Sequence, residues 1–341
     1  MVNVQTVLGP VPAQELGRTL IHEHILIGWY GWQDDSTVAF DRAAAIARAA
    51  EQMAELRSLG ISTLVDPCPI DLGRDVELLA EVSRRSGLNI VCATGLYHEE
   101  MGLPSYFRLR EVEELTEIFC RELQEGVGRT GIRPGIIKCA TGPHEVGPHE
   151  EKVLRAAARA HLATGVPILT HTSGGRLGPE QLDILLAEGV QPSSVLIGHC
   201  CANANLSYHL ELLQRGCAIG IDQIGLEFLM PDQVRLAITA SLCQLGWAQR
   251  LFVSQDHVSC YPGRFIKLPP EIMVALAKRT YTYLLTDWLP RLQQEFQVPA
   301  STVETLLVDN PRRLFEQAQA NAQGRPPSGA AGRGAEGEAR P

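Results

Sequence analysis

The feature that most constrains the fold of this chain is a regular alternation of two kinds of segment. Short apolar stretches rich in strand-forming residues recur, and stretches with helical spacing lie between them. Eight strands with intervening helices favour a parallel sheet, and eight is the number that closes a (β/α)8 TIM barrel. The predicted strands are Thr19–Leu26, Ser62–Cys68, Asn89–Tyr97, Gly135–Thr141, Pro167–Ser173, Val195–Cys200, Cys217–Gln223 and Leu251–His257.

An open doubly wound sheet is the rival arrangement for such an alternation. That fold usually carries a glycine fingerprint for nucleotides directly after its first strand. Here the first strand ends in HEHILIGWYGW instead. The sequence therefore favours a single α/β barrel.

The predicted helices begin and end at suitable residues. Asp41 is a good N-cap for the first helix and Gly60 a good terminator, and His149–Thr164 stops at Gly165. After the eighth strand we expect C-terminal helices over Glu271–Glu295 and Val303–Glu316. From about Asn321 the chain lacks apolar periodicity, so we predict a barrel over residues 1–318 and a flexible, disordered tail over 319–341.

Composition excludes several classes of partner. The formal net charge is -9, which argues against nucleic acid or an anionic membrane surface as the main partner. The nine cysteines have no repeating spacing and mostly lie in or beside apolar segments, as expected of reduced thiols. The first residues resemble no signal peptide, and no apolar run of 18 residues occurs. We therefore expect a cytoplasmic protein that acts on a small molecule.

Polar side chains gather where the predicted strands end, and the carboxyl ends of barrel strands are where such folds place their active sites. Side chains two apart on a strand project to the same face, so two histidines of the first strand enter the barrel mouth while Glu23 points away. Four further strands each contribute one group. The six candidates are His22, His24, Lys138, His171, His199 and Asp256.

Each candidate alone has a structural explanation. A single histidine is more often a hydrogen-bonded structural residue, Lys138 could pair with a carboxylate, and Asp256 could cap a turn. Together, four imidazoles, a lysine and an aspartate without partners in an apolar barrel would be costly. Coordination of zinc, cobalt, manganese or iron removes that cost.

The other histidines fit a metal site poorly. His161 and His209 lie on predicted helices, and we expect them at the surface. His98, His144 and His149 lie in the loops after the third and fourth strands, where a role in substrate binding is open.

The sequence resembles the phosphotriesterase-like branch of the amidohydrolase superfamily, which includes phosphotriesterases and lactonases. The resemblance begins at QTVLGPVPAQELGRTLIHEHIL and continues through IIKCATG, PILTHTSGG, VLIGHC and LFVSQD, as far as about Glu316. It implies a homodimer with a binuclear centre of two divalent transition metals, zinc foremost. By position, one metal would be held by His22, His24 and Asp256 and the other by His171 and His199.

The resemblance also implies that carbon dioxide converts Lys138 into a carbamate that bridges the two metals. A lysine desolvated in a barrel core shifts toward the neutral amine, which can react in this way. A hydroxide held between the metals would then attack the substrate, with Asp256 accepting the proton. Tyr97 occupies the place of a tyrosine that lies near the metals and substrate in lactonases, although it could equally be a packing residue.

Two residues depart from the family pattern. Gln223 replaces a histidine or arginine, and Ala202 replaces an aspartate that passes protons outward. Neither can relay a proton by ionising, which leaves lactone or ester hydrolysis ahead of efficient organophosphate triester hydrolysis. The loops Ile224–Asp232 and Val258–Pro270 should form the pocket, with a mostly apolar lining from Leu226, Phe228, Tyr261 and Phe265, although Arg264 and Lys267 could meet an anion.

Two alternatives remain open at this point. The same metal centre could hydrolyse a phosphorylated or amide substrate. In another class, the chain could be a non-catalytic metal-containing binding protein, in which case the altered relay would mark lost chemistry. The intact set of six candidate ligands argues against the latter.

Overall fold

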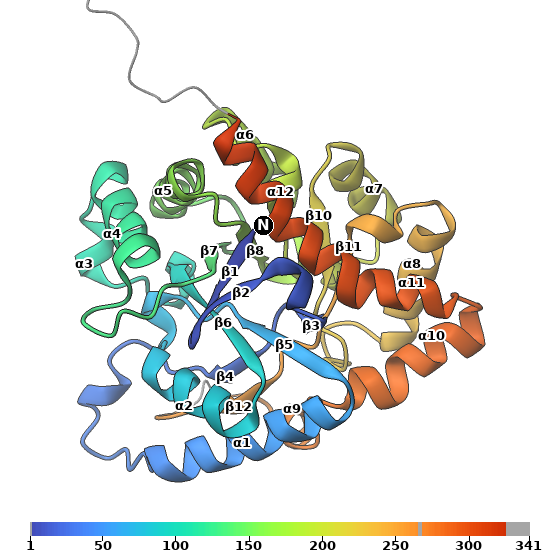
Figure 1. Cartoon of the computed structure of the whole chain (residues 1–341), viewed down its shortest axis with the longest axis horizontal. Helices are drawn as coiled ribbons and strands as arrows, with labels where there is room; N and C mark the ends of the chain where they lie inside the picture. Colours follow the sequence, from blue (N-terminus) through green and yellow to red (C-terminus); the bar gives the residue numbers. More distant parts are fainter. Residues whose placement is uncertain (1, 265–267, 325–341) are drawn as a thin grey trace, which may run out of the picture.

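The computed structural model describes residues 2–264 and 268–324. Eight parallel strands form one sheet in the order β11-β10-β9-β8-β7-β6-β5-β3, so each strand lies beside its neighbour in the chain. The sheet curls into a barrel surrounded by helices (Figure 1). Its strands are β3 (Arg18–Leu20), β5 (Ile61–Asp66), β6 (Asn89–Gly95), β7 (Ile136–Thr141), β8 (Ile168–Thr172), β9 (Val195–Ile197), β10 (Ala218–Ile221) and β11 (Leu251–Val253).

The predicted (β/α)8 barrel is confirmed, and the helices between strands follow the expected alternation. Asp41 caps the first helix, where its side chain accepts from the amide of Ala44, and Gly60 adopts a φ of 91° after its end. The helices of the barrel wall are α1 (Arg42–Ser58), α2 (Val76–Ser86), α3 (Ser105–Arg108), α4 (Val112–Glu125), α5 (Pro148–Thr164), α6 (Gly178–Ala187), α7 (Leu206–Gln214) and α8 (Asp232–Gln244).

The first predicted strand is divided in two. Arg18–Leu20 pairs with β5, whereas His24–Leu26 forms β4 and pairs in parallel with β12 (Val258–Cys260). The chain leaves the sheet at His22, whose amide donates to the side chain of Ser254. The seam between the first and last strands is closed by the amide of Asp256, which donates to the carbonyl of His22 at 3.0 Å.

Two apolar layers hold the barrel together. Residues that point inward, such as Ile21, Val91 and Leu196, form the core inside the sheet, and a second layer packs between the sheet and the helices. An unpredicted hairpin, β1 (Asn3–Thr6) with β2 (Gly9–Pro12), lies with α12 (Asn310–Gln323) across one end of the barrel (Figure 1). This end is therefore plugged, and the catalytic candidates belong to the other.

The C-terminal helices differ from the expectation in their bounds. Instead of one helical region over Glu271–Glu295, the chain forms α9 (Pro270–Ala277), a π-helical turn (Leu284–Trp288) and α10 (Leu289–Phe296). The interruption coincides with Gln255, whose side chain bonds to the backbone of residues 281 and 284.

The last helical region also starts earlier and ends later than expected. It comprises α11 (Ala300–Glu304), a π-helical turn (Thr305–Asp309) and α12, which reaches Gln323. This last helix passes the expected boundary at residue 318 because Ala318 is buried and Asn321 donates to Ser193 and Ser194. Within the described ranges, no helix is long and apolar enough to cross a membrane.

Candidate metal centre

The site begins where the chain leaves β3. His22 and His24 are both buried, and their Nε2 atoms face one oxygen of Asp256, at 3.9 Å and 3.4 Å. Glu23, between them, turns instead to the end of β11, where it accepts hydrogen bonds from the Ser254 hydroxyl and the amides of residues 255 and 257. The sequence His-Glu-His therefore serves two purposes, since two side chains face the site and one fastens the seam of the barrel.

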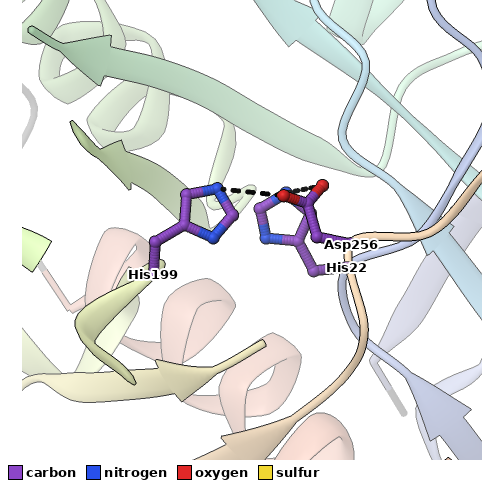
Figure 2. A group of neighbouring side chains, drawn as sticks. All are labelled: His22, His199 and Asp256. Carbon is purple, nitrogen blue, oxygen red and sulfur yellow. Dashed lines mark ion pairs between the residues drawn. The ribbon is translucent and has the colours of Figure 1, made fainter. Parts of the chain in front are cut away.

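His199, which follows β9, and Asp256, which follows β11 at the seam, complete this cluster. Figure 2 shows the ring of His199 facing the carboxylate of Asp256, with Nε2 at 3.7 Å from Oδ2. The same ring stacks on that of His22, with 4.6 Å between centroids. Both His199 and Asp256 have a positive φ, 61° and 52°, which few residues other than glycine adopt. Such backbone is held where the surrounding structure requires it, often at functional sites.

Two further aspartates orient the imidazoles. Asp222, at the end of β10, lies 2.8 Å from Nδ1 of His22 and 3.1 Å from Nδ1 of His199. Asp66, at the end of β5, lies 3.1 Å from Nδ1 of His24. An Nδ1–H that donates to a carboxylate leaves the lone pair of Nε2 free to bind a metal. Sequence analysis did not identify Asp222 or Asp66 as site residues. Both lie near the carboxyl end of a predicted strand, which is the position that identified the other candidates.

Lys138 projects from β7 into the same cluster. Its Nζ lies 3.2 Å from Nε2 of His22, and the residue is 2% exposed. Burial lowers the pKa of Lys138 to about 8, against the opposing charges of Asp256 and Asp222. The amine therefore reaches its neutral form far more readily than an exposed lysine does.

His171 lies at the end of β8 beside His199, with ring centroids 4.5 Å apart. Burial and the charges of His199 and Lys138 hold its pKa well below the usual value, so its ring is neutral. The hydroxyl of Tyr97 lies 3.3 Å from Nδ1 of His171, and burial raises the pKa of this phenol. Tyr97 is thus a protonated hydroxyl within reach of the cluster.

A cavity of about 520 Å³ lies over these residues. Its wall includes the predicted pocket residues Leu226, Phe228, Tyr97 and Tyr261. Phe265 and Lys267 lie outside the described residues, and Arg264 pairs with Asp35 instead of lining this cavity. The lining also contains residues that sequence analysis did not place in the pocket, among them Trp29, Met101 and Arg279.

The remaining histidines differ from expectation in one respect. His161 and His209 are buried, not at the surface, because Nδ1 of His161 bonds to the carbonyl of Val166 and Nε2 of His209 to that of Cys200. His98 lines the cavity, and its ring stacks on His171 with 5.5 Å between centroids.

The two residues that depart from the family pattern both face the cavity. Ala202 contributes a methyl group to its wall. Gln223 uses its amide to donate to Oδ2 of Asp256 at 3.2 Å. Asp256 is thus held by a neutral donor at this position.

The donor set suits transition metals. Three Nε2 atoms, each with its other nitrogen held by a carboxylate, converge on the carboxylate of Asp256, and a readily neutralised amine adjoins them. Imidazole and carboxylate are ligands for zinc and similar ions. A parallel barrel with such a cluster at the carboxyl ends of its strands has the architecture of a metal-dependent hydrolase.

Comparison with known proteins identifies the family. A sequence model of the phosphotriesterase family matches residues 2–315, and the chain belongs to this family. The phosphotriesterase homology protein of Mycobacterium tuberculosis is 38% identical, over 93% of this chain and 98% of the relative. The aryldialkylphosphatase of Saccharolobus solfataricus is 31% identical, over 89% and 96%.

Solved structures agree with the family assignment. A variant of a PTE-like lactonase from Deinococcus radiodurans superposes with a TM-score of 0.87 at 39% identity, covering 92% of this chain and 99% of that one. The expected family, barrel and hydrolase class are therefore confirmed.

Proposed function

We propose that this protein is a binuclear metal-dependent hydrolase that cleaves lactones or related esters, with secondary activity on organophosphate triesters. The observation that carries the proposal is the convergence of His22, His24, His199, Lys138 and Asp256 beneath an apolar cavity. Relatives described as a lactonase and as an aryldialkylphosphatase support both substrate classes.

His22, His24 and Asp256 would hold one divalent ion, and His171 and His199 the other. Lys138, as its carbamate, would join them, because a buried amine with a lowered pKa is the form that reacts with carbon dioxide. Bound zinc, the metal we favour over cobalt, manganese or iron, would supply Lewis acidity and a nucleophilic water at neutral pH.

The protein's own groups account for the rest of the reaction. Asp256 is the proton acceptor we propose, since nearby histidines outweigh its burial and hold its pKa well below the usual value, so that it is ionised. Tyr97 keeps its proton and can donate a hydrogen bond to an oxygen of the substrate beside His171. The apolar side chains Leu226 and Phe228 would exclude water from that oxygen.

A neutral substrate is favoured over a phosphorylated one by the charges in the cavity. Among the described residues that line it, the cationic side chains are Lys138 and Arg279. Lys138 belongs to the metal cluster, and the guanidinium of Arg279 donates to three backbone carbonyls. Apart from the proposed metal ions, no described cationic side chain of the lining is therefore free to bind a phosphate group of the substrate.

A substrate panel tests the proposal. Purified protein reconstituted with zinc should contain about two ions per chain, the stoichiometry of a two-metal site. It should hydrolyse γ- or δ-lactones faster than aryl esters, and these faster than paraoxon-like triesters. Hydrolysis of phosphorylated or amide substrates alone would favour the alternative enzyme, and full metal content without turnover would favour a binding protein.

We also propose that the protein is a cytoplasmic homodimer. All nine cysteines are free thiols, which suits a reducing compartment. Light scattering of the purified protein should give twice the mass of the 37.3 kDa chain, and a monomer would contradict the assembly.

A further inference from the structure

Arg279 lies between α9 and the π-helical turn and reaches back toward the metal cluster. Its Nη1 lies 3.4 Å from the carbonyl of Asp256, and its Nη2 lies 3.2 Å from that of Ile224 and also bonds to that of Gln255. One guanidinium therefore joins the ends of β10 and β11. The planar fork of arginine suits this task, because its donors point in fixed, divergent directions.

The backbone that Arg279 holds is the turn that carries Asp256. This aspartate has a φ of 52°, a conformation that most residues other than glycine avoid. Glu23 accepts the amides of residues 255 and 257 on one side of the turn, and Arg279 binds the carbonyls of residues 255 and 256 on the other. The turn is thus fastened through both its donors and its acceptors.

Among the described residues, none gives the side chain of Asp256 a comparably rigid support. The neutral amide of Gln223 donates to Oδ2 at 3.2 Å, and the Nε2 atoms of three histidines lie 3.4 Å or more from the carboxylate oxygens. The direction in which the carboxylate points is therefore set mainly by the turn beneath it.

We propose that Arg279 is a positioning residue of the metal centre, which fixes the Asp256 turn and so sets metal affinity and the rate of the chemical step. The proposal rests on the binuclear centre proposed above. Arg279 also lines the substrate cavity, so the rival role is a direct contact with substrate. The two roles differ in what they change, because a positioning residue acts on metal binding and kcat, whereas a substrate contact acts on KM.

Three full-length variants separate these roles. Arg279→Met removes all three bonds, and Arg279→Lys keeps the charge without the fork. Lys278→Met removes the neighbouring exposed cation, whose side chain bonds to none of the described residues of this turn, and is the matched control. Each protein is stripped of metal and reloaded with zinc or cobalt.

The readouts are the zinc dissociation constant from chelator competition, the visible spectrum of the cobalt form, and kcat and KM for a δ-lactone. For Arg279→Met we expect zinc affinity to fall about tenfold to 100-fold, the size seen when a partner of a metal ligand is lost. The cobalt spectrum should change, and kcat should fall with little change in KM. Arg279→Lys should lie between Arg279→Met and the wild type, and Lys278→Met should match the wild type.

Unchanged zinc affinity and cobalt spectrum in Arg279→Met, or a raised KM with unchanged kcat, would overturn the proposal. If Arg279→Met fails to fold by circular dichroism, Arg279→Lys decides, and wild-type zinc affinity in that variant overturns it. Wild-type protein that binds fewer than two ions would instead contradict the proposed function, whatever the variants do.

Discussion

Three aspartates contact different nitrogen atoms of the histidines at the centre of the site. Asp222 and Asp66 hold the Nδ1 atoms of three histidines, and Asp256 faces the Nε2 atoms of the same rings. The pKa of His22 falls to about 3 through burial and the charge of Lys138, so this ring is neutral. The pKa of His24 is raised, because hydrogen bonds with Asp256 and Asp66 outweigh its burial. The two carboxylates beside His24 therefore favour its protonated form.

Lys138 is the residue whose replacement tests the proposed bridge most directly. Lys138→Ala removes the amine that would carry the proposed carbamate, so we expect activity on lactones to be abolished. Short carboxylates such as acetate or propionate should restore part of the activity, because they can occupy the same space as a bridging anion. Lys138→Ala that retains activity without added carboxylate would contradict the bridging role.

Asp71 makes the free energy of unfolding depend on pH. Asp71 is 6% exposed and accepts the amide of Tyr97, and burial raises the pKa of its carboxyl to about 6. Its folded pKa lies above the unfolded value of about 4, so its contribution to stability is full below pH 4 and is lost as the pH rises through 6. A difference of two pKa units corresponds to about 3 kcal/mol.

Asp71→Asn should keep the acceptor for Tyr97 and remove this dependence. Relative to the wild type, we expect the free energy of unfolding of Asp71→Asn to rise between pH 4.5 and pH 7 by about 2 kcal/mol, because part of the wild-type loss has already occurred at pH 4.5. Urea unfolding of both proteins at several pH values measures the difference, in which effects common to both cancel. A difference that is equal at pH 4.5 and pH 7 would contradict the role of Asp71.

At the scale of elements, the loop between β10 and α8 supplies Leu226 and Phe228 to the cavity and is fastened by a buried ion pair. Arg235, which is fully buried, donates to Asp232 at 2.6 Å and to the carbonyl of Leu226 at 3.1 Å. Asp232 in turn accepts the amide of Gly225. The pocket wall is therefore braced from beneath by charges that do not face the substrate.

Breaking this pair should destabilise the fold. Arg235→Met leaves the carboxylate of Asp232 buried without its cation, which typically costs about 3–5 kcal/mol. The double variant Arg235→Met with Asp232→Asn should recover part of that loss, because no unpaired charge remains buried. Urea unfolding midpoints of the single and double variants measure both effects, and equal midpoints for the two would show that the charge pair is not the cause.

The helices and strands also show which features of the fold and site could be predicted from the sequence. The sites at strand ends were predictable because apolar segments alternate with helical spacing and because His171, His199 and Lys138 each lie within such a segment, at or after its middle. The contact of Arg279 with the Asp256 turn could not be predicted, because Arg279 binds carbonyls that lie more than twenty residues earlier in the chain. The burial of His209 was missed for a similar reason, since its partner, the carbonyl of Cys200, is supplied by tertiary structure.

At the scale of the whole molecule, the candidate ligands connect segments from all around the barrel. They come from the β3–β4 connection, the start of β4, β7, β8, the end of β9 and the turn after β11. The two ends of the sheet meet beside them, where Asp256 donates its amide to His22 and His24 donates its amide to the carbonyl of His257. Ions bound here would therefore join the first and last strands as well as their neighbours.

Metal removal should consequently lower the stability of the entire barrel. An ion that binds the folded chain alone adds about 4 kcal/mol when its concentration is 1,000 times the dissociation constant. For a domain of this size we expect chelation to lower the melting temperature by on the order of 10 °C. Scanning calorimetry with and without a zinc chelator measures the shift, and Lys138→Ala, which we expect to bind metal more weakly, should shift less. Identical melting temperatures before and after verified zinc removal would mean that the ions, if bound, do not fasten the seam.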